Sequence, residues 1–246
     1  MSRGPLTVAI HQPEHLPWLG FFHKAAQVDV FVLLDTVQYR HKYFQNRNRI
    51  RSHQGICWLT VPVLLKGRGR PLFRDVQINP WDLRWREKCW RSISLNYTRA
   101  RFFEAHAEFF QGVYSRKWEL LVDLNVELLR YLFHVLGITA SVVRASELRA
   151  SGTGPELIVN IAQELGADGY LSGISGIAGR GTVPEELFQR RGIAVRYQAF
   201  HHPIYRQLHH PFLPGMSVID LLLNYGPESL AIIQGVGVET MAQVFE

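Results

Sequence analysis

Residues 6–34, LTVAIHQPEHLPWLGFFHKAAQVDVFVLL, decide the fold class. Two short apolar runs at 6–11 and 28–34 enclose a segment, 17–27, that starts with Pro17 and is predicted to be helical, because proline in the first turn favours a helix start. A strand, a helix and a strand within about 30 residues are typical of a βαβ unit. Such a unit joins parallel strands by a right-handed crossover. The sequence therefore predicts an α/β protein with a largely parallel sheet.

The same alternation of strands and helices returns after residue 140. The elements predicted there are strands at 141–144, 169–172 and 194–198, and helices at 155–165, 184–191, 218–223 and 229–233. Before them, residues 81–136 carry apolar side chains at helical spacing, and Gly137 is a frequent kind of helix stop. We therefore expect a single Rossmann-like α/β domain over residues 1–246, with a helical insertion or lid around 81–136.

A second, smaller group of strands is predicted between the two α/β parts. Residues 56–63 read as a strand that pairs with residues 48–52 through a turn at His53-Gln54-Gly55. Pro62 limits how far this strand can continue inside a sheet. A further short strand is predicted at 76–78.

Composition excludes several classes of protein. The 246 residues are 47% hydrophobic and 12% aromatic, which argues against disorder. No run of 18 apolar residues is present, so we expect no membrane span. A proline at position 5 comes too early for a signal peptide, and two cysteines do not make a disulfide framework. We expect a cytoplasmic protein.

Positive charge is concentrated in the first part of the chain. Residues 1–100 hold 16 Lys or Arg and 6 Asp or Glu, a net charge of +10, whereas residues 101–246 hold 11 and 15, a net charge of −4. Nine basic residues lie from Arg40 to Arg74, without one acidic residue between Asp35 and Asp75. Such a field attracts anionic partners. A solvated basic face is the simpler alternative, but the absence of acidic counter-charge over this stretch favours an anion site.

The first candidate site follows the first two predicted strands. His11 and Gln12 stand where the first strand ends, and Asp35 stands where the second ends. Ligands of parallel sheets bind beyond the carboxyl ends of the strands, so His11 and Gln12 are candidate catalytic residues and Asp35 a candidate ribose or amine contact. The glycine-rich motifs of dinucleotide sites and P-loops are missing here.

An amide-rich segment is the second candidate. Gln45, Asn46, Arg47 and Asn48 place three amides next to a guanidinium, which binds phosphate or carboxylate in a bidentate fork. We expect these four residues to hold an anionic donor. Aromatic residues among the charges also fit nucleic-acid binding.

Two later segments add candidate residues. Ser172, Gly173 and Ser175 open a glycine-rich loop at the end of a predicted strand, where exposed amides can form an anion nest. His202 is a second candidate base, because histidine titrates near neutrality. Neighbouring histidines at 201, 202, 209 and 210 have no acidic or cysteine residue among them, so no metal site is expected.

Short blocks of sequence spread over residues 8–230 share the pattern of a known family. They include Ala9-Ile10-His11-Gln12-Pro13, Leu16-Pro17-Trp18-Leu19-Gly20-Phe21, Phe44-Gln45-Asn46-Arg47-Asn48, Tyr170-Leu171-Ser172-Gly173, His202-Pro203-x-Tyr205-x-Gln207 and Ser217-Val218-Ile219-Asp220-Leu221-Leu222. In these blocks the chain resembles the WbqC-like protein family, although His15 stands where the family usually has tyrosine. The resemblance implies a biosynthetic transferase in surface-polysaccharide or specialised metabolism, and it adds Tyr205 and Gln207 to the expected substrate or donor contacts.

The function that these observations favour is the transfer of an activated acyl, aminoacyl or glycosyl group onto a sugar or small metabolite. The expected donor is an anionic nucleotide, nucleotide sugar, acyl-CoA or aminoacyl-tRNA, and no other cofactor is assigned. Two alternatives stay open. One is a tRNA- or nucleic-acid-binding module that uses the basic stretch from Arg40 to Arg74, and the other is a non-catalytic component of a biosynthetic complex.

Overall fold

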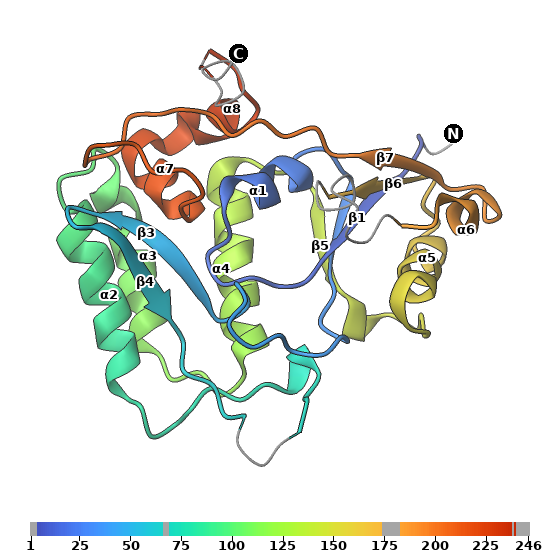
Figure 1. Ribbon diagram of the computed structural model, residues 1–246, viewed down its shortest axis with the longest axis horizontal. Helices are drawn as coiled ribbons and strands as arrows, with labels where there is room; N and C mark the ends of the chain where they lie inside the picture. Colours follow the sequence, from blue (N-terminus) through green and yellow to red (C-terminus); the bar gives the residue numbers. More distant parts are fainter. Residues whose placement is uncertain (1–3, 66–68, 174–182, 238, 240–246) are drawn as a thin grey trace. The chain divides into compact units, whose positions relative to one another are not determined.

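The computed structural model describes residues 4–65, 69–173, 183–237 and 239 (Figure 1). Internal contacts divide the chain into two compact units. Unit 1 consists of Met1–Gln12, His23–Thr36 and Thr139–Phe200, and unit 2 of Pro13–Phe22, Val37–Ile138 and His201–Glu246. Unit 1 contains the parallel sheet, and unit 2 contains a hairpin and most of the helices. The single domain and the lid-like insertion stay predictions.

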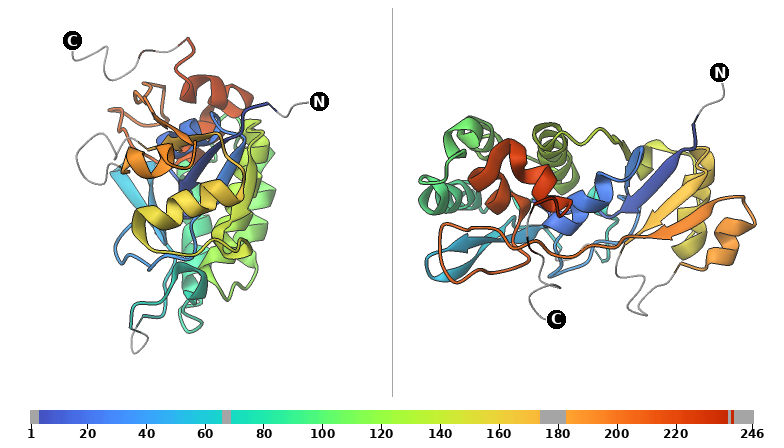
Figure 2. Two further views of the ribbon diagram at one scale, coloured as in Figure 1. Left: turned by 90° about the vertical axis from the view of Figure 1, so that its right-hand side faces the viewer. Right: turned by 90° about the horizontal axis from the view of Figure 1, so that it is seen from above.

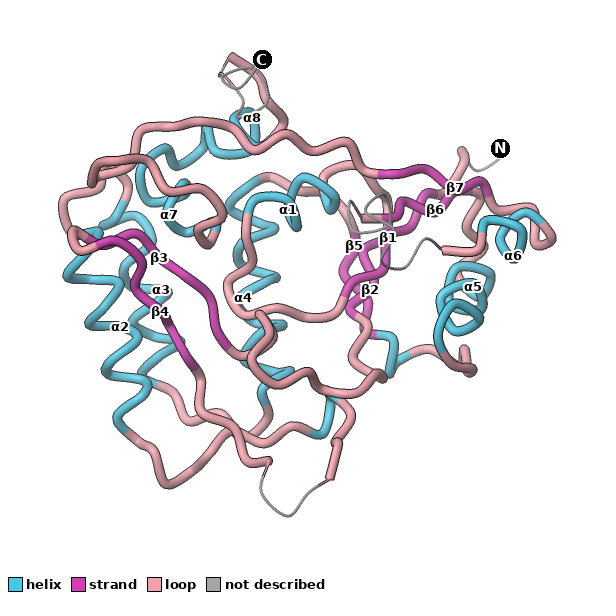
Figure 3. The backbone as a smooth tube through the Cα atoms, viewed as in Figure 1, coloured by secondary structure: helices cyan, strands magenta, loops and turns pink. Residues whose placement is uncertain are grey.

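The sheet of unit 1 confirms the predicted α/β class. Its strands are β1 (Thr7–His11), β2 (Val30–Leu33), β5 (Ser141–Arg144), β6 (Gly169–Ser172) and β7 (Ala194–Tyr197). They lie in the order β5-β2-β1-β6-β7, and each neighbouring pair is parallel. Figure 3 marks these strands in magenta. Val8, Ala9 and Ile10 of the central strand are buried, as expected for a strand covered on both faces.

Strand order reverses between β1 and β6, because the chain adds strands on one side of β1 and then on the other. Helix α5 (Gly154–Glu164) precedes β6, and helix α6 (Glu185–Gln189) precedes β7 and packs against it. Figure 2 shows α5 and α6 beside these strands. The reversal matters for function, since ligands of open parallel sheets bind at such a point. Further Rossmann-like detail stays a prediction.

Unit 2 is built around the predicted hairpin. Strands β3 (Arg47–Ser52) and β4 (Gly55–Thr60) are antiparallel, with Ser52 opposite Gly55 at the turn. The helices of this unit are α2 (Arg84–Tyr97), α3 (Phe103–Ser115), α4 (Leu121–Leu136), α7 (Val218–Tyr225) and α8 (Ser229–Ile233). Helix α2 packs against α3 and β4, and α7 contacts β3 and α3, so the hairpin is held between helices.

Several predicted boundaries agree with the structure, and others move. Gly137 ends α4 in the left-handed region, with φ of 71°, as the glycine stop predicts. The helix predicted over 17–27 is shorter, α1 (Leu19–Ala25). The strand predicted at 76–78 is absent: Gln77 and Ile78 make only isolated bridges, to Leu120 and Val63 respectively. The segment lies between residues 62–64 and 119–121 and shares backbone hydrogen bonds with both, but the contact on each side is a single bridge.

Among the described helices, none combines the length and apolar character that a membrane crossing requires.

Candidate functional site

His11 lies at the carboxyl end of β1, beside the point where strand order reverses. Its ring is half-buried and stacks on Phe31, with the centroids 6.5 Å apart. Nδ1 is 2.9 Å from the carbonyl oxygen of Gln12. A carbonyl oxygen only accepts, so Nδ1 carries the ring proton and Nε2 is the unprotonated nitrogen. The fold thus holds His11 in one tautomer.

A buried lysine shapes the charge of this histidine. Lys24, in the last turn of α1, donates to the carbonyl oxygen of Ile10 at 3.3 Å and sits over the Phe31 ring at 5.6 Å. Burial of the imidazole, together with the Lys24 ammonium, lowers the pKa of His11 to about 3. His11 is therefore neutral throughout the physiological pH range.

The next strand brings two of the predicted loop residues to the same edge of the sheet. Ser172 is the last residue of β6 and is buried, and Gly173 follows it. The parallel pairing of β1 with β6 ends at Val8 and Tyr170, and both strands run on from there toward their carboxyl ends. Ser175 lies outside the described residues. His11, Gln12, Ser172 and Gly173 are thus grouped at one edge of unit 1.

Asp35 follows β2, and its carboxylate is fully engaged. Arg144, at the end of β5, donates from Nε to Oδ2 at 2.9 Å, and the Ser146 hydroxyl donates to the same oxygen at 2.7 Å. The backbone N–H of Ser146 donates to Oδ1 at 2.8 Å. The side chain of Asp35 is completely buried, so this arrangement ties the ends of β2 and β5 together. A ligand contact by Asp35 stays a prediction.

The predicted amides lie in unit 2 and are bonded to the backbone. Asn46 donates to the carbonyl oxygen of Val61 at 2.8 Å, and Asn48 donates to that of Leu16 at 2.7 Å. The side-chain oxygen of Gln45 accepts from the N–H of Arg40 at 2.7 Å. All three amides are buried, so their observed contacts hold loops around the hairpin. Donor binding by them is not tested by the structure.

Arginines occupy the opposite face of β3. The Arg47 guanidinium lies 4.5 Å from the centroid of the Trp58 ring, and that of Arg49 lies 6.0 Å from it. Phe44 stacks on Trp58 at 6.3 Å between centroids. We call Phe44, Arg47, Arg49 and Trp58 the hairpin face. Trp58 is 44% exposed, so this face offers an aromatic surface together with positive charge.

His202 is bonded through both ring nitrogens. Nδ1 donates to the carbonyl oxygen of Pro203 at 2.8 Å, and Nε2 accepts from the N–H of Gly215 at 3.0 Å. Burial lowers the pKa of His202. The carbonyl oxygen of Gly215 accepts from Arg49 at 2.9 Å, so one glycine connects two segments that the sequence singled out. A catalytic role for His202 stays a prediction.

Tyr205 and Gln207 meet at a buried carboxylate, Asp220 of α7. The Tyr205 hydroxyl donates to Oδ2 at 2.8 Å, and the Gln207 amide donates to the same atom at 2.9 Å. Tyr97 donates to Oδ1 at 2.6 Å. Burial raises the pKa of Asp220, and these hydrogen bonds and the Arg51 charge oppose the rise. The cluster joins three segments of unit 2.

His15 is a buried link in the same unit. Its Nδ1 lies 3.1 Å from Oδ1 of Asn125, whose amide nitrogen donates to the carbonyl oxygen of Gln45 at 2.8 Å. Asn125 Oδ1 therefore accepts from Nδ1–H, and His15 Nε2 accepts from the Tyr114 hydroxyl at 3.2 Å. Burial lowers the pKa of His15 to about 4. This histidine is neutral and has both nitrogens bonded.

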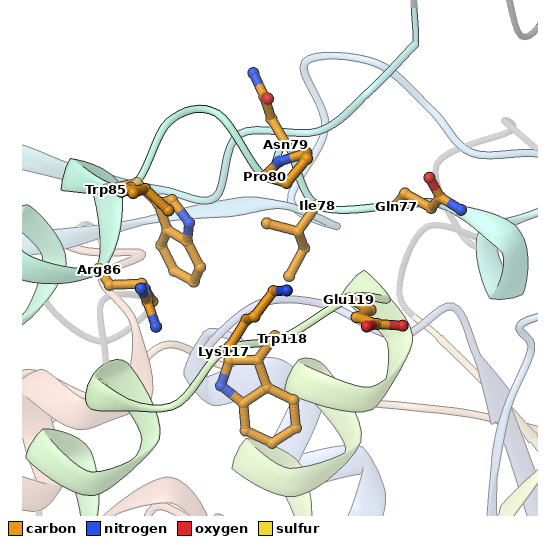
Figure 4. Close-up of a pocket in the computed structure, with 10 residues that line it drawn as sticks. Gln77, Ile78, Asn79, Pro80, Trp85, Arg86, Lys117, Trp118 and Glu119 are labelled. Carbon is orange, nitrogen blue, oxygen red and sulfur yellow. The ribbon is translucent and has the colours of Figure 1, made fainter.

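Unit 2 also contains a cavity of about 270 Å³ with aromatic walls (Figure 4). Trp85 and Lys117 point toward Ile78 across it. Arg86 donates to two carbonyl oxygens and Trp118 donates to one, while Gln77, Lys117 and Glu119 are further polar residues of the lining. The cavity thus combines apolar and aromatic walls with polar side chains at its border.

Several residues of these clusters were not singled out as site residues from the sequence. They are Lys24, Arg51, Tyr97, Asn125 and Arg144. The position of Arg144 at a predicted strand end is a signal that could have found it, whereas the others depend on tertiary contacts. Among the described residues, no group of three His, Cys, Asp or Glu side chains could hold a metal ion.

Comparison of the sequence with known protein families identifies the family of this chain. The family model of WbqC-like proteins matches residues 12–232. The chain belongs to the WbqC-like protein family. Its resemblance to that family, drawn from short blocks, is thereby confirmed over most of its length.

A relative of similar length is found among curated proteins. The chain is 34% identical over 224 residues to the uncharacterized protein Rv1507c of Mycobacterium tuberculosis, and the match covers 90% of this chain and 95% of the relative. No solved structure matches this WbqC-like chain.

Proposed function

We propose that this protein is a group-transfer enzyme whose acceptor binds at the carboxyl edge of β1 and β6. The observation that carries the proposal is the state of His11. It lies at the reversal of strand order as a neutral imidazole, with its proton on Nδ1 and its lone pair on Nε2. Ser172 and Gly173 supply polar groups from the neighbouring strand end.

In this proposal, His11 orients the nucleophile of the acceptor. A hydroxyl or amine of the acceptor donates a hydrogen bond to Nε2, which aims the nucleophile's lone pair at the electrophilic carbon of the donor. A new bond forms to that carbon, and its bond to the anionic leaving group breaks. The proton of the acceptor passes through Nε2 to solvent. With a pKa of about 3, His11 does not keep it.

An anionic donor suits the charge of the chain. The net charge of +10 over residues 1–100 attracts phosphate-bearing molecules. Nucleotide sugars, acyl-CoA thioesters and aminoacyl-tRNA all combine an activated carbon with such an anion. The family's expected association with surface-polysaccharide and specialised metabolism supports a sugar or a small metabolite as the acceptor.

The test is a screen for product formation by mass spectrometry, with each donor class and a panel of sugars and amines. We expect one donor class to release its leaving group only when an acceptor is present. His11→Gln should lower this turnover by about 100-fold or more, whereas His41→Gln, a change at an exposed histidine, should leave it unchanged. Donor binding without turnover would instead make the protein a non-catalytic component. Equal turnover by His11→Gln and wild type would remove His11 from the mechanism.

A second candidate function rests on the hairpin face. Its exposed tryptophan, flanked by Arg47 and Arg49, has the aromatic and basic character of single-stranded nucleic-acid platforms. On this basis the protein binds tRNA, either as a partner or as the carrier of the transferred group.

Filter binding of tRNA at low and high salt tests this second function. Phosphate contacts release counterions, so the affinity should fall steeply as salt rises. Trp58→Ala should weaken binding by about tenfold, since stacking of one base contributes on the order of 1–3 kcal/mol. Trp81→Ala is the control, because Trp81 is 80% exposed and lies outside the hairpin face. Equal affinity in both variants would contradict the role of this face.

A further inference from the structure

Three arginines of unit 2 border one pocket. The pocket has a volume of about 270 Å³. Its lining residues are Arg99, Arg101, Arg206, Gln207, Leu208, His210, Asn224 and Tyr225. We call it the arginine pocket. None of the residues predicted from the sequence to hold an anion, apart from Gln207, belongs to it.

The charge of the arginine pocket is uncompensated. Its lining includes no aspartate or glutamate. Within the described part of the chain, none of the arginines Arg99, Arg101 and Arg206 forms an ion pair. The carboxylate behind the wall, Asp220, accepts hydrogen bonds from two tyrosines and from Gln207. The guanidinium groups therefore keep their donors for a ligand.

Tertiary contacts fix the wall that carries Arg99 and Arg101. This turn connects α2 to α3, and the N–H of Phe102 donates to the carbonyl oxygen of Leu223 in α7 at 2.9 Å. The ring of Phe102 packs against Gly226, so closely that a Cβ at this glycine would lie 2.5 Å from it. The turn is thus bound to the end of α7.

The opposite wall is fixed to the same helix. The backbone N–H of Arg206 donates to the hydroxyl of Tyr225 at 3.0 Å. The amide of Gln207 donates to Asp220, and its oxygen accepts from the N–H of Leu213 at 2.9 Å. Both walls are therefore held by α7, so the backbone positions that carry the three arginines are fixed before a ligand binds.

The positive potential extends beyond the lining residues. Burial is the main cause that lowers the pKa of His209, and the charges of Arg51, His53 and Arg99 lower it further, while Asp220 opposes them. His209, next to the pocket, therefore lies in a region of net positive electrostatic potential.

We propose that the arginine pocket binds the phosphate or diphosphate group of a small molecule. Guanidinium forks match phosphate oxygens in bidentate geometry, and three of them neutralise the charge of a diphosphate. The site is a concave pocket of about 270 Å³ rather than an extended groove, so a compact phosphate compound fits it better than a nucleic-acid strand. This site stands independently of the transfer chemistry proposed for His11.

Isothermal titration calorimetry with pyrophosphate, ADP and a short single-stranded RNA tests the proposal. Wild-type protein should bind pyrophosphate and ADP. The double variant Arg99→Gln/Arg206→Gln should lose about tenfold in affinity for each arginine. The control is Arg84→Gln/Arg91→Gln, which removes the same charge from exposed positions of α2 outside the pocket. It should bind as the wild type does.

Three results would overturn the proposal. The first is that pyrophosphate and ADP do not bind the wild type. The second is an equal loss of affinity in the control variant, which would indicate general charge attraction. The third is RNA binding that depends on Arg99 and Arg206 and that pyrophosphate does not displace, which would assign the pocket to nucleic acid. If the proposal holds, Arg101→Gln alone loses less affinity for pyrophosphate than the double variant does. Thermal unfolding of each variant verifies that it is folded.

Discussion

The hydroxyl of Tyr97 donates a hydrogen bond of 2.6 Å to Oδ1 of Asp220, 123 positions later in the chain. The same hydroxyl accepts from the backbone N–H of Arg51 at 3.0 Å. One oxygen atom therefore connects α2, the hairpin strand β3 and α7. Both side chains are buried, so this connection is a main constraint on how unit 2 is assembled.

Removing this oxygen should destabilise the protein. Tyr97→Phe leaves a carboxylate oxygen and a backbone N–H without their partner, which costs on the order of 2 kcal/mol. Tyr43→Phe is the matched control, since Tyr43 is partly exposed, and its cost should be small. Urea unfolding of both variants measures the difference. Equal stability of Tyr97→Phe and wild type would show that the cluster does not hold the unit together.

The contact between Gly226 and Phe102 makes a second prediction about stability. Gly226 has φ of 53°, and a Cβ there would meet the Phe102 ring at 2.5 Å. Gly192 also has a positive φ, of 71°, but a Cβ there would meet nothing within 4 Å. Gly226→Ala should therefore destabilise the protein more than Gly192→Ala does, which costs about 1 kcal/mol for its backbone conformation.

Thermal unfolding of these two variants measures the added cost at Gly226, where the clash comes on top of a backbone conformation, φ 53° and ψ −122°, that side chains rarely adopt. The additional loss in Gly226→Ala should also weaken pyrophosphate binding, because the glycine positions the turn that carries Arg99 and Arg101. If both variants lose the same stability, the contact between Phe102 and Gly226 does not restrict the side chain at position 226.

His15 predicts how stability depends on pH. Its pKa falls from 6.5 to about 4 on folding. Between these values the unfolded chain binds a proton that the folded chain does not, so stability decreases as pH falls from about 6.5 to about 4. The full cost is on the order of 3 kcal/mol. In His15→Gln the free energy of unfolding should change less over this window, although the variant is less stable overall. His134→Gln, at an exposed histidine, should keep the slope of the wild type.

Much of the fold could be predicted because its signals are local. The strands at 141–144 and 169–172 are short apolar segments bounded by turn residues, and they form where the pattern predicts. The hairpin and the Gly137 stop follow from local turn chemistry in the same way. The segment at 76–78 has a strand-like composition, yet each of its two neighbouring segments contacts it through a single bridge, so no ladder forms.

The candidate sites were less predictable because partners decide what a polar residue does. The sequence indicated that Asn46 and Asn48 bind an anionic donor. Their observed partners are backbone carbonyl oxygens 15 and 32 positions away in the chain. The arginine pocket unites side chains from three separate segments, none of which is a motif by itself. His11 could be proposed from the sequence because the end of a strand at the centre of a parallel sheet is a position that topology alone identifies, and its role stays a prediction.

The central claim is that His11 is a neutral imidazole in contact with the acceptor, and ¹⁵N-edited NMR of the histidine rings tests it directly. The His11 signal is identified by its absence from the spectrum of His11→Gln. We predict that it reports a proton on Nδ1 from pH 8 down to about pH 5, since its pKa is about 3, and that the Nε2 resonance shifts when the acceptor is added. A ring that titrates near 6.5, or an Nε2 resonance that does not move at saturating acceptor, would contradict the account.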